Sequence, residues 1–223
     1  MSKQTDLINV TDAITVSGSN VGIGTSSPDS YYAKKLVVDC GTDVQNGITI
    51  KSSTTGAGMF AFADGTSGSD RYRGYINYNH ANDSMTLGTA GGAGLLGIDA
   101  TGAVTMPAQP AFLVTKNSDQ NNIATGSEVT VTWQAEVFDQ NSDFASNVFT
   151  APVTGKYLLT SAIRVDNLDT ASNYYNFLFT TSNRVYRKII DYGGISGDPV
   201  YWFFSITAIA DMDAGDTASV KIY

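Results

Sequence analysis

The sequence predicts an all-β chain in which a glycine-rich first part is followed by a compact second part. Val, Ile, Thr, Tyr and Phe recur in short runs between Gly, Asn, Asp and Ser, a composition typical of strands joined by turns. Glu occurs only at Glu128 and Glu136, although long amphipathic helices commonly use Glu and Lys. Residues 1–109 contain 16 of the 22 glycines but only 7 of the aromatic residues (2 Trp, 12 Tyr and 10 Phe in all), so the two parts differ in the apolar surface they can bury.

The boundary between the two parts falls at residues 106–110 (MPAQP), because prolines stiffen and delimit connections. Before this boundary, short strand-like pieces lie at 36–38, 47–50, 58–65, 75–78, 85–87 and 103–106. Phe60 and Phe62 share one face of their strand, since side chains alternate. So few large side chains would not offset the entropy of ordering this part within one chain, so we expect it to be buried between identical chains. A loose monomeric sheet is the alternative.

After the boundary, apolar residues alternate over several longer strands separated by turns, which predicts a β-sandwich, with the jelly roll as its eight-to-ten-strand form. The expected inward faces are 157/159/161/163/165, 175/177/179 and 200/202/204/206. The stretch 200–209 is apolar on both faces, which fits either a core strand or a subunit interface. The residues expected to form the core or the contact between subunits are Phe149, Tyr157, Phe177, Phe179, Trp202 and Phe204.

The charge balance excludes several classes of partner. The chain carries 13 Lys and Arg against 21 Asp and Glu, a net charge of −8, with no basic cluster. Binding to nucleic acid phosphates or to an anionic membrane surface is therefore disfavoured. The apolar runs are too short to span a membrane, and the start of the chain does not have the pattern of a signal peptide. Cys40 is the only cysteine, and we expect it to be a small buried residue.

The sequence offers little catalytic chemistry, so we expect a protein that is not an enzyme. His80 is the only histidine, and no G-x-S-x-G motif is present. Three pairs of carboxylates leave glycoside hydrolysis open as an alternative. They are Asp139 with Asp143, Asp166 with Asp169, and Asp211 with Asp213. We interpret these pairs as turn residues, since Asp caps its own backbone in turns.

No cofactor is expected, and calcium is the one metal that the sequence suggests. Asp211, Asp213 and Asp216 have a D-x-D-x-x-D spacing on a predicted turn, and Ca²⁺ prefers such carboxylate oxygens. The full twelve-residue calcium loop is absent. Tyr174, Tyr192 and Tyr201 are expected to be exposed, either stacking on sugar rings or filling subunit interfaces.

Three motifs in the first part resemble elements of bacteriophage tail fibres and tail spikes. Residues 21–28 (VGIGTSSP) with 35–38 (KLVV) look like their "VGIGT-x-x-P…KL-x-V" element. Residues 74–80 (GYINYNH) with 83–87 (DSMTL), and then 98–104 (IDATGAV), are similar to the stretches that follow it. The resemblance covers most of residues 20–106 and implies a trimeric shaft.

The second part resembles the jelly-roll head shared by complement component one-q and the tumour-necrosis-factor superfamily. The residues that carry this resemblance are 138–139 (FD), 143–144 (DF), 148–157 (VFTAPVTGKY) and 214–216 (AGD) followed by Val220. It implies a compact trimer of ten-stranded jelly rolls. The family has a further strand after the last motif, whereas this sequence stops at Tyr223, so we expect the last strand to be missing or supplied by another chain.

Together the two resemblances imply a structural subunit of a phage virion. Residues 1–20 would anchor it to other virion proteins, residues 21–109 would form an intertwined shaft, and residues 110–223 would form the head. We expect a homotrimer that attaches to a glycan or protein of the host surface. A head-decoration or collar fibre that binds no receptor, a glycan-cleaving tail spike, and a cellular adhesin with the same head are the alternatives.

Overall fold

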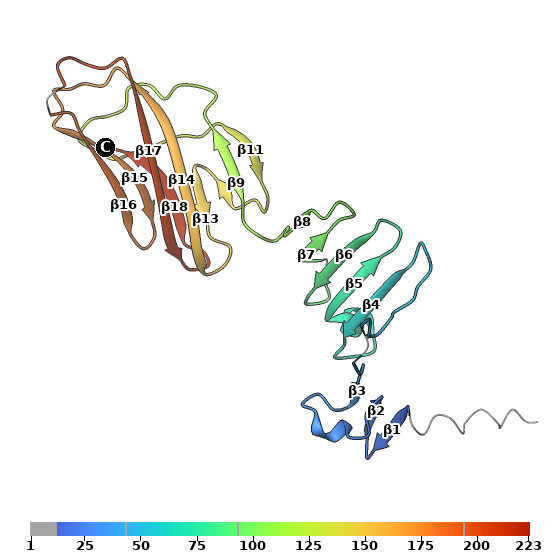
Figure 1. Cartoon of the computed structure of the whole chain (residues 1–223). Helices are drawn as coiled ribbons and strands as arrows, with labels where there is room; N and C mark the ends of the chain where they lie inside the picture. The colour runs from blue at the N-terminus through green and yellow to red at the C-terminus, as the bar shows by residue number, and fades with distance from the viewer. Residues whose placement is uncertain (1–12, 43, 93, 194) are drawn as a thin grey trace, which may run out of the picture.

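The computed structural model describes residues 13–42, 44–92, 94–193 and 195–223, and within them the chain is all-β, as predicted. The described residues form eighteen strands and two short 3₁₀ turns, and no α-helix. The strands belong to several sheets that follow one another along the chain (Figure 1). Of the expected anchoring segment 1–20, residues 1–12 lie outside the described part.

A small three-stranded unit comes first. It consists of β1 (Ile14–Ser17), β2 (Asn20–Ile23) and β3 (Leu36–Val38), with the 3₁₀ turn η1 (Pro28–Ser30) between the last two. Because β2 and β3 are parallel, the chain needs a crossover between them, and η1 provides it.

Gly24 shows why the VGIGT motif needs glycine. Its φ is +75°, a region that favours glycine, and a Cβ there would lie 2.4 Å from the backbone oxygen of Asp39. The motif thus closes the backbone of β2 against the residue that follows β3.

A five-stranded antiparallel meander follows, in the order β4-β5-β6-β7-β8. Its strands are β4 (Ala57–Phe62), β5 (Gly74–Asn79), β6 (Ser84–Gly88), β7 (Leu96–Ile98) and β8 (Val104–Thr105), with η2 (Gly68–Tyr72) after β4. The expected strand at 47–50 does not form, and residues 47–50 are irregular.

The register of this meander gathers its apolar residues on one face. Phe60 lies opposite Ile76, which lies opposite Leu87, which in turn lies opposite Leu96. Tyr78, Met85, Ile98 and Val104 form a second row on the same face. The other face is more polar, with Asn77, Thr86 and Thr105 beside Met59 and Tyr75.

The apolar face of the meander is not covered by any part of the chain that the structure describes. Phe60 is 50% exposed and Phe62 is 65% exposed, and Ile76, Met85 and Leu87 are exposed too. Within the described part of residues 51–110, only Gly88 is buried. A sheet needs an apolar face packed against something to be stable in water, so this sheet lacks the core that its own sequence pattern calls for.

The remaining strands form a two-layered unit of residues 112–222 (Figure 1). Its main sheet has the order β12-β13-β18-β15-β16, with β10 also paired to β18, and two separate pairs, β14-β17 and β11-β9, complete the unit. The strands are β9 (Phe112–Thr115), β10 (Val129–Thr130), β11 (Ala135–Asp139), β12 (Phe144–Ala145), β13 (Val148–Thr150), β14 (Gly155–Asp166), β15 (Tyr174–Thr181), β16 (Val185–Asp191), β17 (Tyr201–Met212) and β18 (Thr217–Ile222).

The core of this unit lies between the main sheet and the β14-β17 pair. The structure places Phe149, Phe177, Phe179 and Phe204 in it, all at least 96% buried. Tyr157 and Trp202 are half-buried and pack against it. The expected inward faces of β14 and β17 point to this core, except at Val200, which precedes β17 and is exposed.

Phe204→Ala should lower the free energy of unfolding of this unit by about 3–5 kcal/mol, because it removes a fully buried aromatic ring and leaves a cavity. Phe138→Ala is the control, because that side chain is half-exposed. Chemical denaturation followed by circular dichroism measures both. Equal losses in the two variants would contradict this position of the core.

Candidate functional site

Two apolar surfaces of the two-layered unit, residues 112–222, are candidates for binding. Below, this unit is called the β14-β17 unit, and the two strands themselves the β14-β17 pair. The first is the outer face of the pair itself. In the register of the two strands Leu158 lies opposite Ile209, and Arg164 lies opposite Phe203. Leu158 is 71% exposed, and Ile209 and Phe203 are each 66% exposed. We call this surface, together with Tyr201, the outer apolar face. Exposed large apolar residues on adjacent strands commonly mark an interaction surface.

Polar groups divide and border the outer apolar face. Thr160 and Thr207 share a hydrogen bond of 3.1 Å across the two strands. Arg164 donates two hydrogen bonds to Asp166, of 2.8 and 3.0 Å, and its guanidinium lies 5.0 Å from the ring centre of Tyr201. Since this pair is exposed, it adds little to stability, but it fixes the orientation of Arg164.

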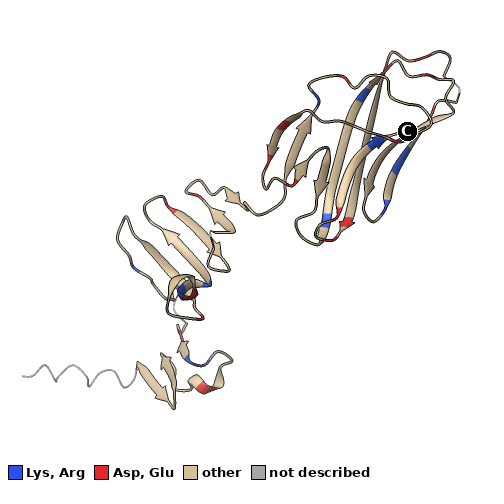
Figure 2. Cartoon of the chain, turned by 180° about the vertical axis from the view of Figure 1, so that it is seen from behind, with Lys and Arg blue, Asp and Glu red and all other residues tan. Residues whose placement is uncertain are grey.

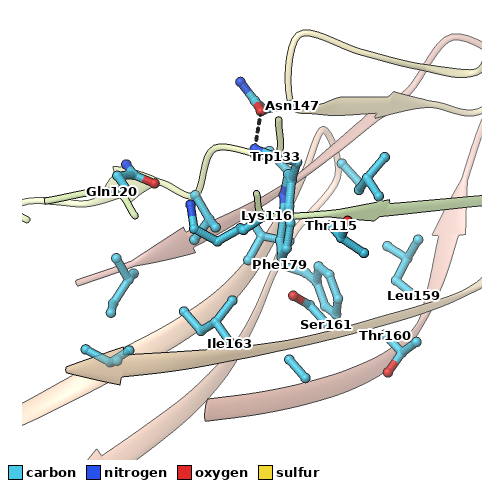
Figure 3. Close-up of a pocket in the computed structure, with 18 of the residues that line it drawn as sticks. Thr115, Lys116, Gln120, Trp133, Asn147, Leu159, Thr160, Ser161, Ile163 and Phe179 are labelled. Atoms are coloured by element: carbon cyan, nitrogen blue, oxygen red, sulfur yellow. Dashed lines mark hydrogen bonds between the residues drawn. The ribbon is translucent and has the colours of Figure 1, made fainter. Parts of the chain in front are cut away.

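The second surface is a deep groove of about 2220 Å³ between β9 and β14 (Figure 3). All four residues of β9 and all of β14 line it, side chains of both parities included. A strand that faces a groove with one face would contribute every second residue. Both strands therefore present their edges to the groove.

The floor of the groove is apolar and belongs to the core. Phe149, Phe179 and Leu159 are buried there, and Trp133 and Ile163 are half-buried beside them. Phe112 stacks on Phe149, with ring centres 5.1 Å apart, so β9 is packed onto the core although it is not paired with β14.

Hydrogen bonds hold the end of the groove next to Trp133 (Figure 3). The Trp133 backbone N–H donates to Oδ1 of Asn147 at 2.7 Å, and Lys116 Nζ donates to the carbonyl of Thr132 at 2.9 Å. Partial burial lowers the pKa of Lys116, with a smaller opposing effect from Asp119. Ser161 is buried in the groove wall, and its Oγ has no hydrogen-bond partner.

The groove is close to neutral. Its ionisable lining residues other than tyrosines are three cations and three carboxylates: Lys116, Lys156, Arg164, Asp119, Asp166 and Asp169. Figure 2 shows that Lys and Arg lie interspersed with Asp and Glu over the chain. A strongly charged ligand is therefore not favoured.

Two of the three carboxylate pairs make contacts with residues near them in the sequence. Asp139 accepts the backbone N–H groups of Asp143 and Phe144, at 3.0 and 2.9 Å. Burial, and secondly the charge of Asp139, raise the pKa of Asp143. Asp166 binds Arg164, and Asp169 accepts the backbone N–H of Ala171. Neither Asp143 nor Asp139 lines the groove.

The structure does not assemble the suggested calcium ligands. Asp216 accepts hydrogen bonds from Asn183 Nδ2 and from the backbone of Asp213, both at 2.8 Å, while Asp211 and Asp213 are exposed. Within the described ranges, no three Asp, Glu, His or Cys side chains lie close enough to hold a metal ion.

His80 and Cys40 both lie at the surface. His80 is exposed, with its ring 4.9 Å from that of Tyr78. The prediction that Cys40 is buried is wrong, because it lies exposed in the turn after β3, where Gly41 donates its N–H to Asp39 Oδ1. No helix in the described part of the chain is long and apolar enough to cross a membrane.

Of the tyrosines expected at the surface, Tyr174 and Tyr201 are exposed, but Tyr192 is not. Tyr192 packs edge-on against Tyr175 and Trp202, at 5.5 and 5.3 Å between ring centres, and its hydroxyl has no hydrogen-bond partner. Aromatic packing beyond the end of β16 thus draws into the core a residue that was expected to be exposed.

The groove itself was not predicted from the sequence, because its walls come from strands far apart in the chain. One local signal existed: Ser161 interrupts an otherwise apolar inward face of β14.

Neither a search of protein-family models nor a search of curated proteins finds a match to this chain.

The stability of the β14-β17 unit should fall as the pH rises from 10 to 12. Burial raises the pKa of Tyr192 to about 12, whereas an unfolded tyrosine has a pKa of about 10. Between these values the unfolded chain loses a proton that the folded chain keeps, so alkaline pH favours unfolding. Denaturation midpoints at several pH values measure this, and Tyr192→Phe should reduce the slope. An unchanged slope would contradict the burial of this hydroxyl.

Proposed function

We propose that this chain is a structural subunit of a phage virion, and that it forms a homotrimeric fibre or spike that attaches to the host surface. The observation that carries the proposal is the uncovered apolar face of the meander β4–β8, defined by Phe60, Ile76, Leu87 and their neighbours. The tail-fibre motifs lie on this meander and on the unit before it, which supports a shaft.

Identical copies are the economical cover for this face. Three sheets arranged about an axis, each with its apolar face inward, enclose a common core and leave their polar faces to water. The outer apolar face of the β14-β17 pair supports the same arrangement for the head, because the residues there are as exposed as those of the shaft. The head motifs support a jelly roll that trimerises.

Attachment to the host surface would depend on having three copies of the head. Three heads held together by one shaft make several weak contacts at once, which raises the overall affinity without any strong single site. Tyr174 on the head is exposed and stacked on Tyr223, with ring centres 6.1 Å apart. Such rings suit stacking on sugars, and the net charge of −8 argues against a phosphate-rich target.

A head-decoration or collar fibre without a receptor has the same fold and assembly. Its position on the particle separates it from an attachment fibre, and antibody labelling of virions in electron micrographs determines that position. Two of the three carboxylate pairs give the glycan-cleaving alternative no support, since turn hydrogen bonds occupy Asp139 and an ion pair occupies Asp166.

The intact chain should sediment at three times its chain mass in analytical ultracentrifugation, and Phe60→Ser should weaken this assembly by tenfold or more. Met59→Ser is the matched control, because Met59 is the neighbouring residue of the same strand, is similarly exposed, and lies on the opposite face. A monomeric wild-type chain, or equal effects of the two substitutions, would refute the shaft proposal.

Ile209→Ser should weaken self-association of the head, since it puts a hydroxyl into the outer apolar face. Ile189→Ser is the control, because Ile189 is 63% exposed, on β16 of the main sheet, against 66% for Ile209. Concentration-dependent light scattering of the full chain compares the two. If Ile189→Ser has the larger effect, the heads associate through the main sheet instead.

A further inference from the structure

The groove between β9 and β14 has two open strand edges as its walls. β9 pairs only with β11, and β14 pairs only with β17. On their other sides, within the described part of the chain, neither strand is paired with another strand. Alternate N–H and C=O groups of each strand therefore point into the groove, along twelve residues on the β14 side.

Such a pair of edges suits one kind of occupant. Backbone groups that face a groove need hydrogen-bond partners, and one extended strand laid between the two edges supplies donors and acceptors to both at once. The apolar floor formed by Phe179, Leu159 and Ile163 then covers every second side chain of that strand.

We infer that this groove binds one extended β-strand of another polypeptide, which has apolar side chains at alternate positions and little net charge. The three cations and three carboxylates of the lining balance one another, so the occupant needs no charge of either sign. The strand would join the β11-β9 and β14-β17 pairs into one continuous sheet. The unpartnered Oγ of Ser161 lies in the wall that this strand would cover.

The binding of such a strand can be tested apart from the trimer. The outer apolar face and the groove share outward residues of β14, Leu158 and Arg164 among them, but Ile209 on β17 does not line the groove. The Ile209→Ser variant should therefore still bind the strand, and this separates a failure of the groove from a failure of the fibre proposal.

The test uses the full chain and a synthetic peptide of about ten residues that alternates Val and Thr. Trp133 lines the groove, so its fluorescence reports on occupancy once the other tryptophan is removed by Trp202→Phe. We expect a saturable blue shift of Trp133 emission. The same peptide with prolines in place of its central valines should give no shift, since proline cannot donate to a ladder.

Two variants locate the binding. Ile163→Lys puts a charge into the apolar floor and should weaken binding by about tenfold or more. Val185→Lys, on the exposed surface of β16, should leave it unchanged. Hydrogen exchange should show new protection of amides in β9 and β14 when the Val/Thr peptide is bound.

The inference is overturned if no shift occurs with the Val/Thr peptide, or if the proline peptide binds equally well. The second result would mark the groove as a general apolar pocket. If Ile163→Lys does not fold, the contrast between the two peptides and the exchange of the β9 and β14 amides still decide the matter.

Discussion

The constraint on which the rest of the structure depends is that the first part of the chain pairs its strands locally but leaves their apolar side chains uncovered. In the meander β4–β8 each strand pairs with the next one along the chain, so this sheet forms without contacts between distant parts of the sequence. Burial is different, because the meander gathers Phe60, Ile76 and Leu87 on one face and leaves that face open. Since burial of apolar surface is the dominant favourable term in folding, the sheet requires a cover from outside its own residues.

The β14-β17 unit, by contrast, buries much of its apolar surface within its own chain. Its main sheet and the β14-β17 pair enclose a core of phenylalanines, so this unit has its own source of stability. It nevertheless leaves two incomplete features: the outer apolar face, which lacks side-chain contacts, and the groove beside β14, which lacks backbone partners as well. The two features call for different partners, because a sheet face packs against another face whereas a strand edge pairs with a strand.

Sequence pattern predicted what depends on alternation. The all-β class and the inward faces of β14 and β17 follow from a period of two, which assigns each side chain to one side of a strand. The pattern failed where tertiary contacts decide. Tyr192 was expected to be exposed, but Trp202 and Tyr175 pack against it and bury it. Cys40 was expected to be buried but follows β3 in an exposed turn. The groove was not predictable, because β9 and β14 meet only after the whole unit has folded.

The glycines explain why the first part buries so little apolar surface within its own strands. Gly24 is required by a left-handed φ and by the close backbone of Asp39. In the meander, the ring of Tyr75 occupies the position that a Cβ on Gly88 would take, at 2.3 Å from its nearest ring atom. Residues of this kind allow tight backbone approach but contribute no apolar surface of their own. A chain that uses its glycines in this way gains compact strands and loses the volume of a core, so the apolar residues on the face of Phe60 are left without a cover from the described part of the chain.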